Sequence, residues 1–137
     1  QLARMVRERL DGVGEQVARI RQALPAIREA LRDRLRQRVQ EAVENPDPER
    51  LEQELVLAAQ KMDVDEELDR LETHVAEVRR VVEKGGQVGR RLDFLMQELN
   101  REANTLASKS VDAETTAAAV ELKVLIEQMR EQIQNIE

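Results

Sequence analysis

Apolar residues recur at helical spacing from the start of the chain. Through the first 44 residues they step by threes and fours, at Val13, Val17, Ile20, Leu24, Ile27, Leu31 and Leu35. This spacing predicts an amphipathic helix with a narrow, coiled-coil-like seam. Gly12, Gly14 and Pro25 fall inside it, and proline removes a backbone donor and crowds the preceding turn. We therefore expect either two helical pieces or one bent rod.

A turn should follow at Asn45-Pro46-Asp47-Pro48, because residues before proline are pushed away from helical geometry. Asp47 is then suited to cap a second helix, with Pro48 at its first position and its end near residue 61. The positions expected on the buried side of this helix are Leu51, Leu55 and Ala58.

A third helix is predicted from Asp63, with Glu66 as its capping-box partner, to Lys84, where Gly85-Gly86 stops it. Its apolar face comprises Val64, Leu68, Leu71, Val75, Val78 and Val82. A fourth helix should run from about residue 88 to between 108 and 110. Its apolar stripe comprises Val88, Leu92, Leu95, Met96, Leu99, Ala103 and Leu106.

The last predicted helix follows a cap at Ser110 or Asp112 and continues to the end of the sequence. Its apolar positions are Leu122, Ile126, Met129, Ile133 and Ile136, with Val120 and Val124 widening the stripe. These helices predict an all-α protein, an antiparallel helical bundle with a long N-terminal helical arm. Residues 1–49 would form the arm or connector, and residues 50–137 a helical domain.

Composition supports this fold class, since 41% of the residues are apolar, 36% are charged and only 1% are aromatic. Net charge is −6, but residues 1–44 hold ten arginines against seven acids, whereas residues 45–83 hold five basic residues against twelve acids. Disulfides and thiolate metal sites are excluded because the sequence has no cysteine. No apolar run approaches a membrane span, so we expect a soluble, cytoplasmic protein without membrane contact. The first residue is not methionine, which indicates a fragment or a trimmed chain.

Candidate chemistry begins in the third predicted helix, where Asp63, Glu67, Arg70 and His74 share the edge of the apolar face. One interpretation makes His74 a metal ligand or proton shuttle with Glu67 as its carboxylate partner. The other is local pairing of Glu67 with Arg70 and of Arg70 with His74. Spacing alone favours the second.

The fourth predicted helix is polar on both sides of its stripe. Glu98 and Glu102 repel each other at i,i+4 spacing. A divalent cation would relieve this repulsion, as would Arg91, Arg101 or an arginine from another chain, and spacing alone favours an arginine. The opposite sector can read phosphate, ribose or base edges, or make contacts between helices. It comprises Asp93, Phe94, Gln97, Asn100, Arg101 and Asn104. Phe94, the one aromatic residue of the sequence, suits either base stacking or packing against a neighbouring helix or subunit.

Basic residues bracket the same helix at Lys84, Arg90, Arg91 and Lys109. The glycine turn leads into the N-terminus of this helix, where free backbone N–H groups can bind an anion. A GGxxG sequence is, however, more often a plain turn between helices. In the arm, Arg28, Arg32 and Arg36 form a ladder that suits a phosphate backbone, diluted by neighbouring acids. One histidine and no cysteine exclude nucleophilic triads, while metal-assisted hydrolysis remains open.

Three stretches together resemble the C-terminal domain of the bacterial YicC family: KMDVDEELDRLETHV, VGRRLDFLMQELNREANTLASKS and VELKVLIEQMREQIQNIE. The resemblance covers about residue 50 to Glu137 and implies a second, N-terminal domain that this sequence lacks. It further implies a metal-dependent endoribonuclease of bacterial RNA turnover that binds RNA and assembles as a homo-oligomer, a hexamer. An RNA-binding adaptor or oligomerisation module serving another RNA-decay enzyme is the alternative.

The residue roles that follow are inferred from side-chain chemistry within the resembling motifs. Mg²⁺ or Mn²⁺ would be held by a carboxylate-rich set with the one histidine. We expect metal and water activation at Glu67, His74, Glu98 and Glu102, and contacts with the scissile phosphate from Arg70 and Arg101. RNA contacts are expected from Arg90, Arg91, Gln97, Asn104, Lys109, Arg28, Arg32 and Arg36, with Asp63 and Asp93 in support.

Overall fold

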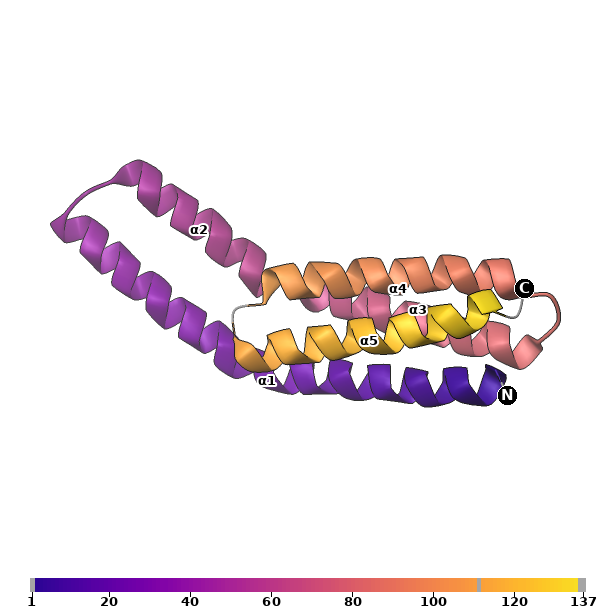
Figure 1. Ribbon diagram of the computed structural model, residues 1–137. Coiled ribbons are helices and arrows are strands. Elements are labelled where there is room, and N and C mark those ends of the chain that lie inside the picture. The colour runs from indigo at the N-terminus through magenta and orange to yellow at the C-terminus, as the bar shows by residue number, and fades with distance from the viewer. Residues whose placement is uncertain (1, 111, 136–137) are drawn as a thin grey trace.

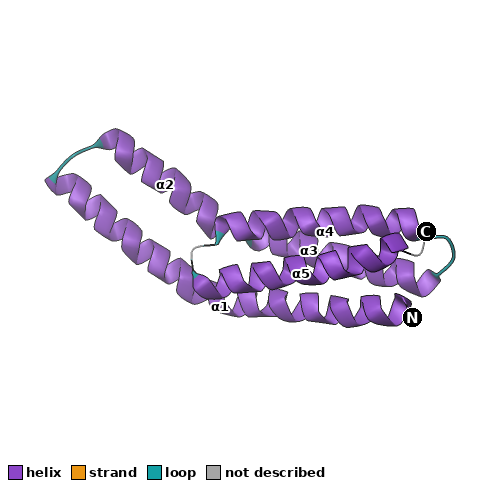
Figure 2. Cartoon of the chain, viewed as in Figure 1, coloured by secondary structure: helices purple, strands orange, loops and turns teal. Residues whose placement is uncertain are grey.

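A computed structural model describes residues 2–110 and 112–135, and every regular element in these ranges is an α-helix. The elements are α1 (Leu2–Glu44), α2 (Pro48–Met62), α3 (Asp65–Lys84), α4 (Gly89–Lys109) and α5 (Ala113–Asn135). The first half of α1 packs with α3, α4 and α5 in a bundle, from which the second half of α1 projects together with α2 (Figures 1 and 2). The prediction of an all-α bundle is therefore confirmed.

α1 runs without interruption through Gly12, Gly14 and Pro25. Its direction changes along its length (Figure 1), so it is one bent rod rather than two helices. Proline inside a helix is a sufficient cause of such a bend, because it leaves one carbonyl of the preceding turn without its donor. Burial divides α1 at the same place, since its buried residues end at Leu24.

The core is built by the first half of α1 together with α3, α4 and α5. α4 contributes the most buried residues, which include all of its predicted stripe from Leu92 to Leu106. In α5, Leu122, Ile126, Met129 and Ile133 are buried as expected. Val120 and Val124 do not widen the stripe, since they are 53% and 42% exposed; Ile136 lies outside the described residues.

The projecting pair of segments is a hairpin made by residues 25–44 of α1 and by α2, which lie side by side (Figure 1). The inward-facing residues are only half-buried: Leu31, Leu35, Leu51 and Ala58. Leu55, expected to be buried, is 43% exposed because two helices alone cannot enclose both flanks of their contact. The arm therefore spans residues 25–62, whereas the sequence suggested residues 1–49, and the first half of α1 belongs to the bundle.

Helix ends agree with the sequence in part. Asp47 caps α2 by accepting a hydrogen bond from the Arg50 backbone N–H (3.3 Å), and Asp112 accepts one from that of Thr115 (3.1 Å). The capping box predicted at Asp63 is wrong, because α3 begins two residues later with Val64 at its N-cap and no side-chain cap. None of the helices in the two described ranges is long and apolar enough to cross a membrane.

Candidate functional site between α3 and α4

Charged side chains line the contact between α3 and α4. Asp63, Glu67, Arg70 and His74 follow one flank of the α3 segment at helical spacing, and Glu98, Glu102 and Lys109 follow the flank of α4 that faces it. Four of these residues are joined by hydrogen bonds: Glu67 and Arg70 from α3, Glu102 and Lys109 from α4. We call these four residues the α3–α4 cluster.

Arg70 connects the two acids of the cluster. Its Nε donates to Glu102 Oε2 at 2.9 Å, and its Nη2 donates to Glu67 Oε1 at 3.3 Å. Its Nη1 lies 3.6 Å from Glu66 Oε2. The hydrogen bond with Glu102, followed by its charge and that of Glu67, raises the pKa of Arg70, so the guanidinium stays charged. The Arg70 side chain is 46% exposed and remains open to a ligand from solvent.

Lys109 closes the cluster at the other end. Its Nζ donates to Glu67 Oε1 at 2.8 Å and to the backbone carbonyl of Asp63 at 2.7 Å. Lys109 therefore ties the last turn of α4 to the connection between α2 and α3. Asp63 contributes its carbonyl oxygen to this contact.

Both carboxylates of the cluster are buried, with Glu67 at 4% and Glu102 at 5% exposure. A buried carboxylate is costly unless cations and donors surround it, which explains why two cations converge on them. Glu67 Oε2 is nevertheless without a hydrogen-bond partner among the described residues. The cluster thus combines the half-exposed guanidinium of Arg70 with a carboxylate oxygen of Glu67 that can accept a further hydrogen bond.

Glu98 and His74 lie along the same seam but outside the hydrogen-bonded cluster. Glu98 Oε2 is 4.0 Å from Arg101 Nη1, the local pairing considered from the sequence. Glu102 instead pairs with Arg70 across the helices, so the two stacked glutamates have different partners. His74 is half-buried one turn after Arg70, on the flank that faces α4.

The four expected metal ligands do not come together into a metal site. In the two described ranges, no three histidine, cysteine or acidic side chains are grouped so that they could hold a metal ion. Around Glu67 and Glu102 the neutralising positions are taken by Arg70 and Lys109. This arrangement of Glu67, His74, Glu98 and Glu102 does not fit an all-protein metal cage.

The outer face of α4 carries the expected RNA-contacting residues. Arg101 is 74% exposed, and Gln97 and Asn104 are exposed as well. Asp93 is occupied within the protein, since it accepts from Gln97 at 3.2 Å and faces Gln134 and Arg130 of α5 at 3.4 and 3.9 Å.

A second charged cluster lies at the far end of the seam and was not predicted. Glu77 of α3 accepts from Arg80 at 2.5 Å and from Arg91 of α4 at 3.2 Å. These two hydrogen bonds, Arg80 first, lower the pKa of Glu77 from 4.5 to about 2. Arg80 and Arg91 remain more than half exposed, and Arg90 beside them is exposed.

The predicted arginine ladder of α1 is partly neutralised. Arg28 bonds to Asp65 at 2.6 Å and thereby fastens the hairpin to the start of α3. Arg36 bonds to Asp33 at 3.0 Å. Arg32 between them is exposed and has no ion pair among the described residues. Only part of the ladder's charge is therefore available to a phosphate backbone.

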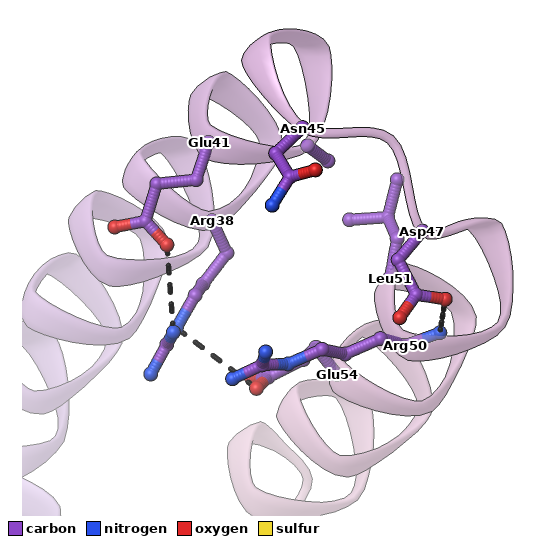
Figure 3. Close-up of a pocket in the computed structure, with 8 residues that line it drawn as sticks. Arg38, Glu41, Asn45, Asp47, Arg50, Leu51 and Glu54 are labelled. Carbon is purple, nitrogen blue, oxygen red and sulfur yellow. Dashed lines mark hydrogen bonds and ion pairs between the residues drawn. The ribbon is translucent and has the colours of Figure 1, made fainter.

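A pocket opens at the tip of the hairpin (Figure 3), and all of its lining residues precede the α3–α4 cluster in the sequence. Within the pocket, Arg38 lies 3.5 Å from Glu41 and 3.9 Å from Glu54, so the charge of Arg38 is paired within the hairpin. Its lining is Arg38, Glu41, Ala42, Asn45, Asp47, Arg50, Leu51 and Glu54. None of the residues expected to act on RNA lines this pocket.

Comparison with known proteins shows the family to which this helical bundle belongs. Residues 20–137 match the family described as "Endoribonuclease YicC-like, C-terminal", and the chain belongs to that family. It is 57% identical over 133 residues to "Probable endoribonuclease YicC" of Haemophilus influenzae, covering 97% of this chain and 46% of that protein. A protein of the same name from Clostridioides difficile is 37% identical over 140 residues, with 100% and 48% covered. The chain thus spans about half the length of the curated relatives it matches.

Proposed function

We propose that this chain is the C-terminal helical part of a bacterial endoribonuclease, in which the α3–α4 cluster acts on the scissile phosphodiester of RNA. The names of the two bacterial relatives support the reaction class. The observation that carries the proposed site is the convergence of Arg70 and Lys109 on two buried carboxylates. Cleavage of a phosphodiester needs positive charge on the non-bridging oxygens and groups that move protons, and the cluster holds both kinds of group.

Arg70 is the residue best suited to contact phosphate. Its planar guanidinium presents several donors in a fixed fork that matches phosphate oxygens. Its weakest contact is the one at 3.6 Å with Glu66, and exchange of this contact for a phosphate oxygen leaves the two shorter bonds intact. Arg101, with a single contact at 4.0 Å, supplies a second cation on the same helix as Glu102.

Proton transfer is assigned to Glu67, Glu102 or His74. Glu67 has the unpartnered oxygen, and Glu102 accepts one bond through Oε2. His74 carries an imidazole group, the side chain that most often transfers protons in enzymes. Glu98, one turn before Glu102, is a further carboxylate beside the proposed phosphate position.

Dependence on Mg²⁺ or Mn²⁺ is proposed for the whole enzyme with RNA bound. Mg²⁺ keeps several waters and is often held by one or two carboxylates together with substrate phosphates. Such a site needs fewer protein ligands than a closed cage. RNA, rather than a preformed ligand set in the described residues, would then complete the coordination.

A non-catalytic RNA-binding adaptor or oligomerisation module is the second candidate function. It is favoured by the internal pairing of the cluster, which a purely structural ion network would also show. Both candidate functions include assembly of the full-length protein as a hexamer. Light scattering of the full-length protein tests this assembly.

The deciding experiment uses full-length protein and structured RNA, with and without EDTA. Arg70→Lys, His74→Ala, Glu98→Gln and Glu102→Gln are compared with Glu121→Gln, an exposed glutamate of α5 outside the seam. We expect cleavage to fall at least about tenfold in Arg70→Lys and Glu102→Gln and to remain unchanged in Glu121→Gln. Full cleavage by every seam variant contradicts the site, and RNA binding without cleavage by the parent protein supports the adaptor.

A further inference from the structure

Phe94 is the one aromatic residue in the sequence, and it does not lie in the core. It is 50% exposed in the first half of α4, although an aromatic ring gains most from burial. The other helices of this chain thus leave about half of the Phe94 side chain uncovered. A single exposed apolar residue is ordinary by itself, so its surroundings decide whether it has a role.

Three arginines lie on the same side of α4 as Phe94. Arg90 and Arg91 lie one turn before it, and Arg101 lies two turns after it on the same side. All three are exposed, Arg91 at 54% and Arg101 at 74% of their side chains. Glu98, the acid one turn after Phe94, is three-quarters buried and lies 4.0 Å from Arg101. Arg91 also donates to Glu77 of α3 at 3.2 Å. An exposed ring is thus set among arginines along one helix.

The position of Phe94 relates it to the proposed active site. It precedes Glu102 by eight residues, which corresponds to about 12 Å along the helix axis. A strand whose phosphate reaches the α3–α4 cluster would therefore pass this ring when it follows α4 toward its N-terminus.

We infer that Phe94 is a stacking platform for a nucleobase of single-stranded RNA beside the cleaved bond, and that Arg90, Arg91 and Arg101 contact the phosphates around it. The inference rests on the proposed function and names how its substrate is held. Aromatic stacking between basic residues is the usual way of holding single strands, and it tolerates any base. A protein partner seated on Phe94 would have to desolvate the surrounding arginines, whereas a polyanion complements them.

Tryptophan fluorescence tests the contact directly. Phe94→Trp places an indole at this position, and this chain has no other tryptophan or tyrosine. Full-length Phe94→Trp protein is titrated in EDTA with a single-stranded RNA oligonucleotide, and the parent protein is subtracted as background. Val120→Trp is the matched control, because Val120 of α5 is similarly exposed at 53% but lies on another helix. Binding is measured in parallel by anisotropy of labelled RNA.

We expect RNA to quench the indole emission of the Phe94→Trp variant along the binding curve and to leave the control unchanged. We also expect Phe94→Leu, which keeps apolar bulk without a ring, to weaken binding by about 5-fold to 150-fold. Binding seen by anisotropy without quenching, or equal quenching in the control, overturns the platform and leaves the nuclease proposal intact. An emission spectrum of the Phe94→Trp variant that is typical of a buried indole before RNA is added, and unaffected by RNA, shows a protein contact instead and also overturns it. Absence of any RNA binding by the parent protein overturns both proposals.

Discussion

Replacement of Lys109 by methionine tests whether Lys109 compensates the buried charge of Glu67. Methionine keeps most of the apolar stem and removes the two short bonds from Nζ, to Glu67 Oε1 and to the Asp63 carbonyl. Glu67, 4% exposed and already holding one unpartnered oxygen, would keep Arg70 at 3.3 Å as its remaining partner.

The magnitude follows from this geometry. Removal of one partner from a buried ion pair costs about 3–5 kcal/mol. Arg70 still compensates Glu67 in part, and the Lys109 side chain is 23% exposed, so water also screens the charge. We expect a loss of about 2–3 kcal/mol in the free energy of unfolding, which for a chain of this size lowers the Tm by about 6–12 °C.

Urea unfolding followed by far-ultraviolet circular dichroism measures this loss. Lys123→Met is the control, since Lys123 is exposed on α5, and it should change stability by less than about 0.5 kcal/mol. The double variant Glu67→Gln with Lys109→Met should be more stable than additivity of the two single variants predicts, because the uncompensated charge is gone. Equal stability of Lys109→Met and Lys123→Met, or an additive double variant, would refute the reasoning.

Three further outcomes are expected. The pKa of Glu77 is about 2 in the folded state, against an ordinary value of 4.5. The parent should therefore be more stable than Glu77→Gln above pH 4.5 and should lose this advantage as the pH falls toward 2. Paired Tm values of the two proteins across this pH range measure the difference. Gly86→Ala should lower the free energy of unfolding by about 1–2 kcal/mol, because Gly86 has a φ of +84° that alanine adopts only with strain. Gly14→Ala inside α1 should raise it by about 1 kcal/mol, because alanine favours a helix more than glycine does. Denaturant midpoints that shift in the same direction in both variants would contradict this argument. Pro25→Ala should raise stability by up to about 3 kcal/mol and straighten α1, and small-angle scattering with unchanged dimensions would contradict its role in the bend.

Sequence periodicity predicted the helices well because their signals are local. The proline turn capped by Asp47 and the glycines with positive φ, Gly85 and Gly86, lie where the sequence placed them. Amphipathic spacing also identified the stripe of α4. It failed for Leu55 and Val124, because whether an apolar flank is covered depends on how many helices surround it.

The sequence selected charged residues of α3 and α4, whose roles stay predictions, but it did not give their partners across the two helices. Spacing rules relate residues three or four apart, so they anticipated the contact of Glu67 with Arg70. The bond from Arg70 to Glu102 joins residues on two helices, and its register comes from core packing. The pairing of Arg91 with Glu77 escaped prediction for the same reason, although Arg91 itself was considered as a partner for other acids.

The path of α1 has a mechanical consequence. This 43-residue helix, about 65 Å long, is shared by the bundle and the hairpin, with Pro25 between them. A change in the bend at Pro25 would therefore move the hairpin relative to the bundle, and the bond between Arg28 and Asp65 restrains the hairpin close to this bend. A change of about 10° there carries the tip, about 20 residues or 30 Å away, through roughly 5 Å. Through the bond between Arg28 and Asp65, a movement of the hairpin tip would thus slightly rotate the beginning of α3, which lies less than two turns before Arg70.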